Sequence, residues 1–228
     1  MDKYNIVFNR FQGYTTINTV RNYCSCALNN NECNCATSKN GIVASLDVWL
    51  ARFFDEYLIW HHSGTAMLCS WIAVELDMCA QNKRVLIQAS LLHDIGKLFV
   101  PHTILTKMEG LNDEEMAIMK NHAAVGADFL LSIGFSKDIV LTVKHHHERF
   151  DGAGYPDGLL GHDIPLYSRI ISVADTLDAM LSGRHYHNSK YNQIEIAKAL
   201  ENGAGTQYDP QIVEIAVKYI LKKERMYV

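Results

Sequence analysis

The amino-acid sequence predicts an all-α fold, a helical bundle with one long loop. Apolar residues recur at helical spacing from Ser45 onward, and residues typical of helix caps separate these stretches. Residues 150–166 break the pattern, because they contain four Gly and two Pro. This segment, which includes Gly154-Tyr155-Pro156, is called the GYP loop below. We therefore expect helices on both sides of one irregular segment.

Several helix ends can be located from capping residues. Ser45 can cap the first helix, Asn112 with Glu115 resembles a capping box, and Asp209-Pro210 is typical of a helix start. The helix opened at Asn112 is expected to carry His122. The expected helices cover residues 45–57, 62–78, 85–96, 112–122, a segment ending near 133 before Gly134, 136–147, 167–181, 191–202 and 210 onward.

The first residues differ in composition from the rest. Asn, Thr, Cys and Ser dominate residues 18–40, without helical or alternating periodicity. We expect residues 1–44 to form a Cys-containing N-terminal extension and residues 45–228 to form the main helical domain.

Cysteines are concentrated in this extension in a CxC-x6-CxC pattern. The four residues are Cys24, Cys26, Cys33 and Cys35. Four thiolates this close can hold a tetrahedral Zn²⁺ or a cluster metal, although structural zinc sites usually space their cysteines by two to four residues. A reduced loop or redox-responsive thiols are the alternatives. Cys69 and Cys79 lie in apolar helical sequence and are interpreted as core thiols.

Charge and hydropathy exclude some classes of protein. The formal net charge is -4, which argues against indiscriminate binding to duplex nucleic acid. No apolar run reaches the roughly 18 residues of a membrane helix, and the polar N-terminus does not resemble a signal peptide. We expect a cytoplasmic protein that is not embedded in a membrane.

Two histidine motifs indicate a metal site. His93-Asp94 lies near a predicted helix end, and His146-His147 ends another helix. Adjacent helical residues point about 100° apart, so His93 can serve one metal while the Asp94 carboxylate bridges two. Imidazole and carboxylate together suit Fe, Mn, Zn or Ni.

Three further residues need polar partners. His122 lies on an apolar-periodic face, Asp175 lies in an apolar helix, and His62 opens another. Each has an ordinary explanation when taken alone: a histidine hydrogen-bonded in the core, or an Asp175 paired with Arg169 or Arg184. Their joint occurrence with the two motifs favours a metal site.

The motifs His93-Asp94-Ile95-Gly96-Lys97, His122 and His146-His147-Glu148, followed by Asp151-Gly152-Ala153-Gly154-Tyr155-Pro156, resemble the HD-GYP subfamily of HD-domain phosphohydrolases. The resemblance extends from about Ser45 to the C-terminus. It implies an all-α metal-dependent hydrolase of cyclic dinucleotides, chiefly cyclic di-GMP, with Fe or Mn as the usual metals. The implied metal ligands are His62, His93, Asp94, His122, His146, His147 and Asp175. His62 is preferred to His61 because His62-Ser63 matches the family pattern.

The expected chemistry is attack on phosphorus by a metal-bridging hydroxide, since a bound metal can lower the pKa of water to about 7. Asp94 and Lys97 are the candidate catalytic residues, and Lys97 can also meet a non-bridging phosphoryl oxygen. Lys97 has an alternative role as a cation at a helix C-terminus. Arg184 and Tyr186 resemble an Arg-x-Tyr element that lies near the nucleotide in the family. Tyr155 is a further candidate for substrate binding, or packs the GYP loop, which the family also uses for contacts with partner proteins.

Some positions depart from the family pattern. Leu58 stands where members with a third metal carry an acidic residue, so we expect two metals. His187 and Ala153 also differ from the usual residues, which leaves the hybrid cyclic GMP-AMP open as a substrate. The expected products from cyclic di-GMP are linear pGpG and GMP.

Other functions stay open at this point. The chain could hydrolyse ordinary nucleotides, or serve as a non-catalytic cyclic-dinucleotide sensor or partner-binding module. The complete set of ligands argues against the sensor. The four cysteines of the extension could control the enzyme through metal binding or redox state. The chain could also form a homodimer.

Overall fold

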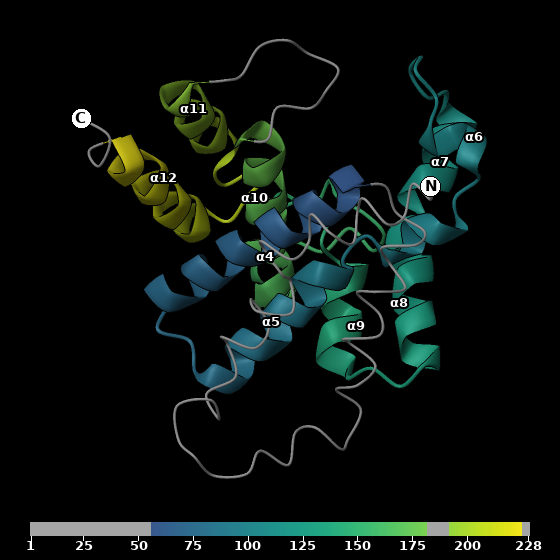
Figure 1. The fold of residues 1–228 in the computed structure, drawn as a ribbon, viewed down its shortest axis with the longest axis horizontal. Coiled ribbons are helices and arrows are strands. Elements are labelled where there is room, and N and C mark those ends of the chain that lie inside the picture. The colour runs from purple at the N-terminus through teal and green to yellow at the C-terminus, as the bar shows by residue number, and fades with distance from the viewer. Residues whose placement is uncertain (1–55, 182–191, 225–228) are drawn as a thin grey trace, which may run out of the picture. The chain divides into compact units, whose positions relative to one another are not determined.

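A computed structural model describes residues 56–181 and 192–224 of the chain (Figure 1). Contacts divide the chain into two units, residues 1–59 and 60–228, and the account below concerns the second. Among the described residues there are helices and two isolated β-bridges but no strand, which confirms the predicted all-α class. The cysteine cluster of the extension, Arg184 and Tyr186 lie outside the described residues.

The first two helices of the described residues form a hairpin with apolar residues between them. Helix α4 spans Glu56–Glu75 and α5 spans Ala80–Leu92. Ala66 of α4 packs with Ile87 and Leu91 of α5. The sequence prediction that a helix opens at His62 is wrong, because α4 runs through this position. No Pro or Gly separates Tyr57 from His62, so nothing interrupts the backbone hydrogen bonds there.

The chain turns sharply after α5 and packs closely on a later helix. His93 and Asp94 form the junction between α5 and the 3-10 helix η3, Ile95–Phe99. Gly96 lies against α8, His122–Ser132, so closely that a Cβ on Gly96 would lie 1.9 Å from the His122 carbonyl oxygen. This glycine contact brings His122 next to the His93-Asp94 junction.

The predicted capping box is confirmed, but the helix that it opens is shorter than expected. Asn112 and Glu115 cap each other at the start of α7, Asp113–Lys120, which follows the short helix α6, His102–Leu105. The chain breaks at Asn121, and His122 begins α8 instead of continuing α7. His122 Nδ1 donates to the Met119 carbonyl at 2.7 Å. The side chain thus bonds a C-terminal carbonyl of α7 and turns toward the interior.

Helix α9 spans Lys137–Lys144, so the expected helix through His147 ends early. His145, His146 and His147 form a turn, in which the Glu148 amide donates to the His145 carbonyl at 3.0 Å. The turn continues into the GYP loop, which contains the 3-10 helix η4, Gly161–Asp163. His146 and His147, the two predicted metal ligands of this segment, therefore lie in a turn and not in a helix.

Three helices complete the described fold. Helix α10 spans Leu166–Leu181, α11 spans Gln193–Gly203 and α12 spans Pro210–Glu224. Asp209 caps α12 by accepting from the Gln211 amide at 2.9 Å, as predicted. Arg169 of α10 pairs with Asp209 at 2.5 Å, so the suggested pairing of Arg169 with Asp175 is wrong. The pair joins α10 to the start of α12.

Apolar side chains fill the space between these helices. The largest fully buried ones are Leu68, Ile72, Leu86, Ile95, Leu130, Ile164, Ile170, Ile171, Leu177, Ile196, Leu200 and Ile212. They come from α4, α5, η3, α8, α10, α11, α12 and the segment before α10. One apolar core therefore connects these helices. In the described part of the chain, no helix is both long and apolar enough to cross a membrane.

Candidate metal centre

Asp94 lies at the centre of a buried group of histidines. Its Oδ1 lies 3.2 Å from His122 Nε2 and 3.9 Å from His146 Nε2. Its Oδ2 lies 3.4 Å from His93 Nε2 and 3.8 Å from His62 Nε2. Each carboxylate oxygen thus faces a different pair of imidazoles, which is the arrangement expected of a bridging ligand.

Two donor groups share this carboxylate. Asp94, His122, His146 and His147 offer ligand atoms that all lie within 4.8 Å of one another, and so do His61, His93 and Asp94. The first group draws on α8 and the turn after α9, and the second on α4 and the end of α5. Five of the seven predicted ligands belong to these two groups, and they converge from segments far apart in the sequence. His62 and Asp175 belong to neither group, and the second group contains His61 in place of His62.

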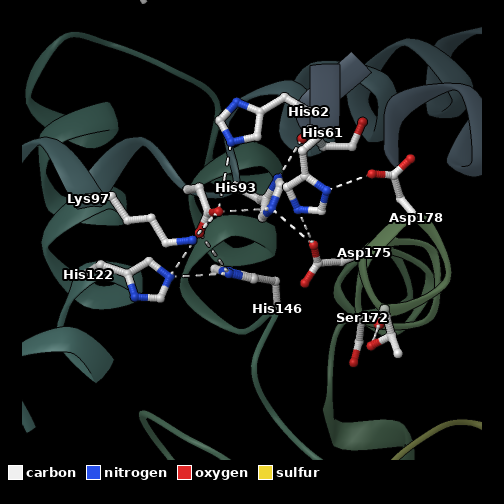
Figure 2. A network of polar contacts seen from close by, with 12 residues as sticks. His61, His62, His93, Lys97, His122, His146, Ser172, Asp175 and Asp178 are labelled. Carbon is white, nitrogen blue, oxygen red and sulfur yellow. Dashed lines mark hydrogen bonds and ion pairs between the residues drawn. The ribbon is translucent and has the colours of Figure 1, made fainter. Parts of the chain in front are cut away.

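Backbone carbonyls orient three of these imidazoles. His93, His122 and His146 donate from Nδ1 to the carbonyls of Ser90, Met119 and Val143, at 2.7, 2.7 and 2.6 Å. A histidine whose Nδ1–H bonds a carbonyl presents an unprotonated Nε2, which is the usual tautomer of a metal ligand. The three Nε2 atoms point toward the centre (Figure 2).

The centre has acceptor atoms that face one another. His122 Nε2 and His146 Nε2 are 3.4 Å apart, and with both Nδ1 atoms protonated their lone pairs face each other. His93 Nε2 and Asp94 Oδ1 are buried without a hydrogen bond. Buried acceptors without a donor are costly, and a cation between them removes that cost. The nitrogen and carboxylate set fits one or more divalent metals.

Burial and charge shift the pKa values of these groups. Burial lowers the pKa of His62 and of His147 to about 4, and lowers the pKa of His146 well below its ordinary value. These three imidazoles are therefore neutral near pH 7, as metal binding requires. Burial acts against ionisation of Asp94, but Lys97 and His93 outweigh it and hold the Asp94 pKa well below its usual range.

The ligand set expected from the sequence prefers His62 to His61 and does not include Asp178, but His61 and Asp178 both lie at the centre. His61 lies between two carboxylates, with Nε2 2.7 Å from Asp175 Oδ1 and Nδ1 2.6 Å from Asp178 Oδ2 (Figure 2). Burial lowers the His61 pKa, but the two carboxylates outweigh it and raise the pKa to about 9. The signal in the sequence was Asp178, three residues after Asp175 and thus on the same face of the helix.

Asp175 lies at the edge of the centre, with 24% of its side chain exposed. Its Oδ1 is 3.6 Å from His93 Nε2 as well as in contact with His61. Burial opposes its ionisation, but the hydrogen bond from His61 and the nearby His93 ring hold the Asp175 pKa well below its usual range. Asp175 is therefore an anionic ligand candidate next to the second donor group.

Lys97 brings an ammonium group to the centre. Its Nζ lies 2.5 Å from Asp94 Oδ2, and 27% of its side chain is exposed. The ammonium group thus reaches from the surface to the bridging carboxylate, where an incoming anion can meet it. Tyr155 stacks on the His147 ring with centroids 4.9 Å apart, and burial raises its pKa. Lys97 and Tyr155 therefore both lie beside the centre.

The fold and the site together define a helical bundle built around a candidate metal centre, and comparisons with known proteins agree. The sequence model of the family described as HD domain matches residues 41–212. A cyclic di-GMP phosphodiesterase of Thermotoga maritima is 39% identical over 182 residues, covering 77% of this chain and 47% of that protein. A 3'3'-cGAMP-specific phosphodiesterase of Vibrio cholerae is 33% identical over 181 residues, covering 77% of this chain and 42% of that protein.

Among solved structures, Bd1817 of Bdellovibrio bacteriovorus, an HDGYP protein, superposes with a TM-score of 0.58 at 23% identity, covering 71% of this chain and 51% of that chain. This likeness supports the fold. The chain belongs to the HD-domain family, and its motifs are of the HD-GYP kind, as the resemblance indicated. It spans less than half the length of the two phosphodiesterases that it matches.

Proposed function

We propose that the chain is a metal-dependent phosphodiesterase that hydrolyses a cyclic dinucleotide, with cyclic di-GMP as the first candidate substrate. The observation that carries this proposal is the buried Asp94 carboxylate shared by two histidine groups. The names of the two relatives support the substrate class.

The proposed ligands are those expected from the sequence: His62, His93, Asp94, His122, His146, His147 and Asp175. Bound divalent metals would lower the pKa of water and neutralise charge on the phosphoryl oxygens. The chain's own residues prepare the site: carbonyl bonds fix the imidazoles, and the low pKa of Asp94 keeps its carboxylate ionised. Lys97 can contact a non-bridging phosphoryl oxygen from its place beside Asp94.

The names of the relatives indicate two candidate substrates. One relative is a cyclic di-GMP enzyme and the other is specific for 3'3'-cGAMP, so the hybrid cyclic GMP-AMP is the second candidate. Tyr155 offers a ring beside His147 on which a base can stack. Arg184 and Tyr186 stay predicted substrate contacts, as do the products pGpG and GMP.

Fe or Mn are the proposed metals, with Zn and Ni as alternatives, since imidazole and carboxylate suit all four. A separate Zn²⁺ bound by Cys24, Cys26, Cys33 and Cys35 stays a prediction of the sequence. The division into residues 1–44 and 45–228, the cytoplasmic location, a signalling partner at the GYP loop and a homodimer also stay predictions.

The proposed function can be tested by chromatography of cyclic di-GMP and hybrid cyclic GMP-AMP after incubation with anaerobically purified chain loaded with Mn or Fe. Asp94→Ala should lose bound metal and turnover together, because the substitution removes the carboxylate shared by both donor groups. Asp128→Ala is the matched control, since Asp128 is exposed on α8.

Linear dinucleotide or GMP from the wild-type chain and from Asp128→Ala, but not from Asp94→Ala, would support the proposal. Full turnover and normal metal content in Asp94→Ala would contradict the site. Bound metal without turnover of either cyclic dinucleotide would favour the sensor or another nucleotide substrate.

A further inference from the structure

Glu148 is a buried carboxylate that has no part in the proposed metal centre. Only 3% of the residue is exposed. Its Oε1 accepts from the amides of Asp157 and Gly158, at 2.7 and 3.1 Å, and its Oε2 accepts from the Leu159 amide at 3.1 Å. Hydrogen bonds from backbone amides to a carboxylate are stronger than neutral ones. One side chain thus holds three consecutive residues of the GYP loop.

The position of these bonds in the sequence connects them to the centre. Glu148 directly follows His147, and Asp157 directly follows Tyr155-Pro156. The Tyr155 amide also donates to the His147 carbonyl at 3.3 Å. The carboxylate therefore joins the backbone next to a proposed metal ligand to the backbone next to the proposed substrate contact.

Three further contacts hold the loop near these residues. Asp157 pairs with Lys144 at 2.7 Å and with His145 Nε2 at 2.9 Å, both at the end of α9. Gly154 lies directly on the turn, because a Cβ there would be 2.2 Å from the Arg149 amide nitrogen and 2.5 Å from Glu148 Cα. Only a glycine allows this close approach.

The fastened loop places the Tyr155 ring in a defined stack. The ring lies 4.9 Å from the His147 ring at an interplanar angle of 29°, and Lys120 Nζ lies 5.5 Å from its centroid. An aromatic face with an ammonium group nearby suits a ligand that carries both a base and a phosphate. A shift of the loop would separate all three side chains.

We propose that Glu148 is a positioning residue, which clamps the GYP loop on the turn after α9 and thereby holds Tyr155 where the substrate binds. The part that concerns substrate rests on the proposed function. The clamp acts on Tyr155, whereas backbone carbonyls orient His93, His122 and His146. The loss of the clamp therefore weakens substrate binding and leaves metal binding in place.

The test compares the Mn-loaded full-length chain with Glu148→Gln. An amide cannot accept at both ends, so the substituted side chain turns an NH₂ group toward at least one of the three loop amides. Hydrogen exchange at residues 157–159 should become at least about tenfold faster. With cyclic di-GMP, KM should rise about tenfold while kcat stays within about threefold, which is the pattern of lost binding. Metal content per chain should not change.

Asp163→Asn is the matched control, because Asp163 is an exposed carboxylate of the same loop. Gly154→Ala is the second variant, which lifts the loop while leaving Glu148 intact, and it should raise KM and the exchange rates in the same way. Unchanged exchange in a folded Glu148→Gln chain would overturn the clamp. Faster exchange with the KM of the Asp163→Asn control would overturn the role in substrate binding.

The proposed function is tested separately by the wild-type chain. If it hydrolyses neither cyclic di-GMP nor hybrid cyclic GMP-AMP, the proposed function fails. The exchange rates and the metal content, which need no turnover, still decide whether Glu148 holds the loop.

Discussion

His61 and His62 are adjacent, and both side chains enter the centre. His62 Nε2 lies 3.8 Å from Asp94 Oδ2, at a separation that leaves room for an ion between them, whereas His61 Nε2 is 2.7 Å from Asp175 Oδ1, a direct hydrogen-bond distance. The other ring nitrogen of His61, Nδ1, bonds to Asp178 Oδ2. This geometry favours His62 as a ligand and His61 as a residue that orients Asp175.

Substitution of each histidine by alanine tests this assignment, and each variant is the control for the other. His62→Ala should lose at least one bound metal per chain, because a ligand is removed. His61→Ala should keep its metals at saturation but bind them about 10- to 100-fold more weakly, as is typical when an orienting partner is lost. Metal content and competition with a chelator measure both effects. Loss of metal in His61→Ala alone would reverse the two roles.

The low pKa values of the buried imidazoles predict how the stability of the metal-free chain depends on pH. In the unfolded chain His62 and His147 take up protons near pH 6.5, but in the folded chain they do so only near pH 4. The unfolded state therefore binds more protons between these values, and stability falls as pH falls from about 6.5 to 4. His61, with its pKa raised to about 9, is already protonated in both states at the lower end of this range.

Urea denaturation of the chelator-treated chain at several pH values measures this effect, which is on the order of 3 kcal/mol for each imidazole. His147→Gln should reduce the loss of unfolding free energy between pH 6.5 and 4, because one of the two imidazoles is removed. His102→Gln should leave it unchanged, because His102 is exposed. A stability that is constant over this range in the wild-type chain would contradict the prediction.

At the residue scale, the sequence predicted which side chains gather because chemistry limits the choice. A cluster of histidines and aspartates in apolar sequence has few ways to be satisfied other than a shared ion. The sequence could not assign His61 and Asp178, because the pairing of His61 with Asp175 and Asp178 depends on contact between α4 and α10, helices more than a hundred residues apart. A Cβ on Gly64 would lie 1.9 Å from Asp178 Oδ1, so this glycine makes room for the pair.

At the element scale, the centre depends on how closely η3 approaches α8. A Cβ on Gly96 would meet the His122 carbonyl oxygen at 1.9 Å and the Gly126 amide nitrogen at 2.8 Å. These are backbone atoms, which cannot rotate away as the end of a side chain can. The distance between the His93-Asp94 junction and His122 is therefore controlled by one missing methyl group.

Gly96→Ala should destabilise the fold by at least about 1–3 kcal/mol, the usual range for an overpacked core, and should weaken metal binding by moving His122. Gly110→Ala is the matched control, because a Cβ there would meet nothing within 4 Å. Its effect should stay within about 0.5 kcal/mol. Urea denaturation and metal content measure both variants, and equal behaviour of the two would show that the close contact does not matter.

Most helices were predicted from their caps and apolar spacing, and two of the errors lie where tertiary contacts override that spacing. The break at Asn121 and the turn at His145 interrupt sequences that could continue as helices. In both places a histidine ring bonds a carbonyl of the preceding turn, His122 to Met119 and His145 to Leu141. Such bonds compete with the helix, but which of the two forms is decided by packing on the rest of the core.

At the scale of the whole molecule, the described centre uses residues of α4, α5, α8, the turn after α9, and α10. The predicted extension, residues 1–44, supplies none of the proposed ligands, and the family model begins at residue 41. The division stays a prediction from composition, which rests on the expectation that a stretch without periodic apolar residues contributes no helix face to the core. The fold and the metal centre should therefore be independent of the extension.

A chain of residues 45–228 should fold, bind the same number of metals at the histidine centre and turn over substrate as the full-length chain does. The full-length variant with Cys24, Cys26, Cys33 and Cys35 replaced by Ser separates the two roles of the extension. If the cysteines hold a Zn²⁺, this variant and the shorter chain should both lose one zinc per chain relative to the wild-type chain, with no change in Mn or Fe. Elemental analysis and circular dichroism measure the outcome. Loss of helicity or of the Mn or Fe in the shorter chain would mean that the domain boundary lies before residue 45, since a helix that starts earlier would then be needed to complete the core.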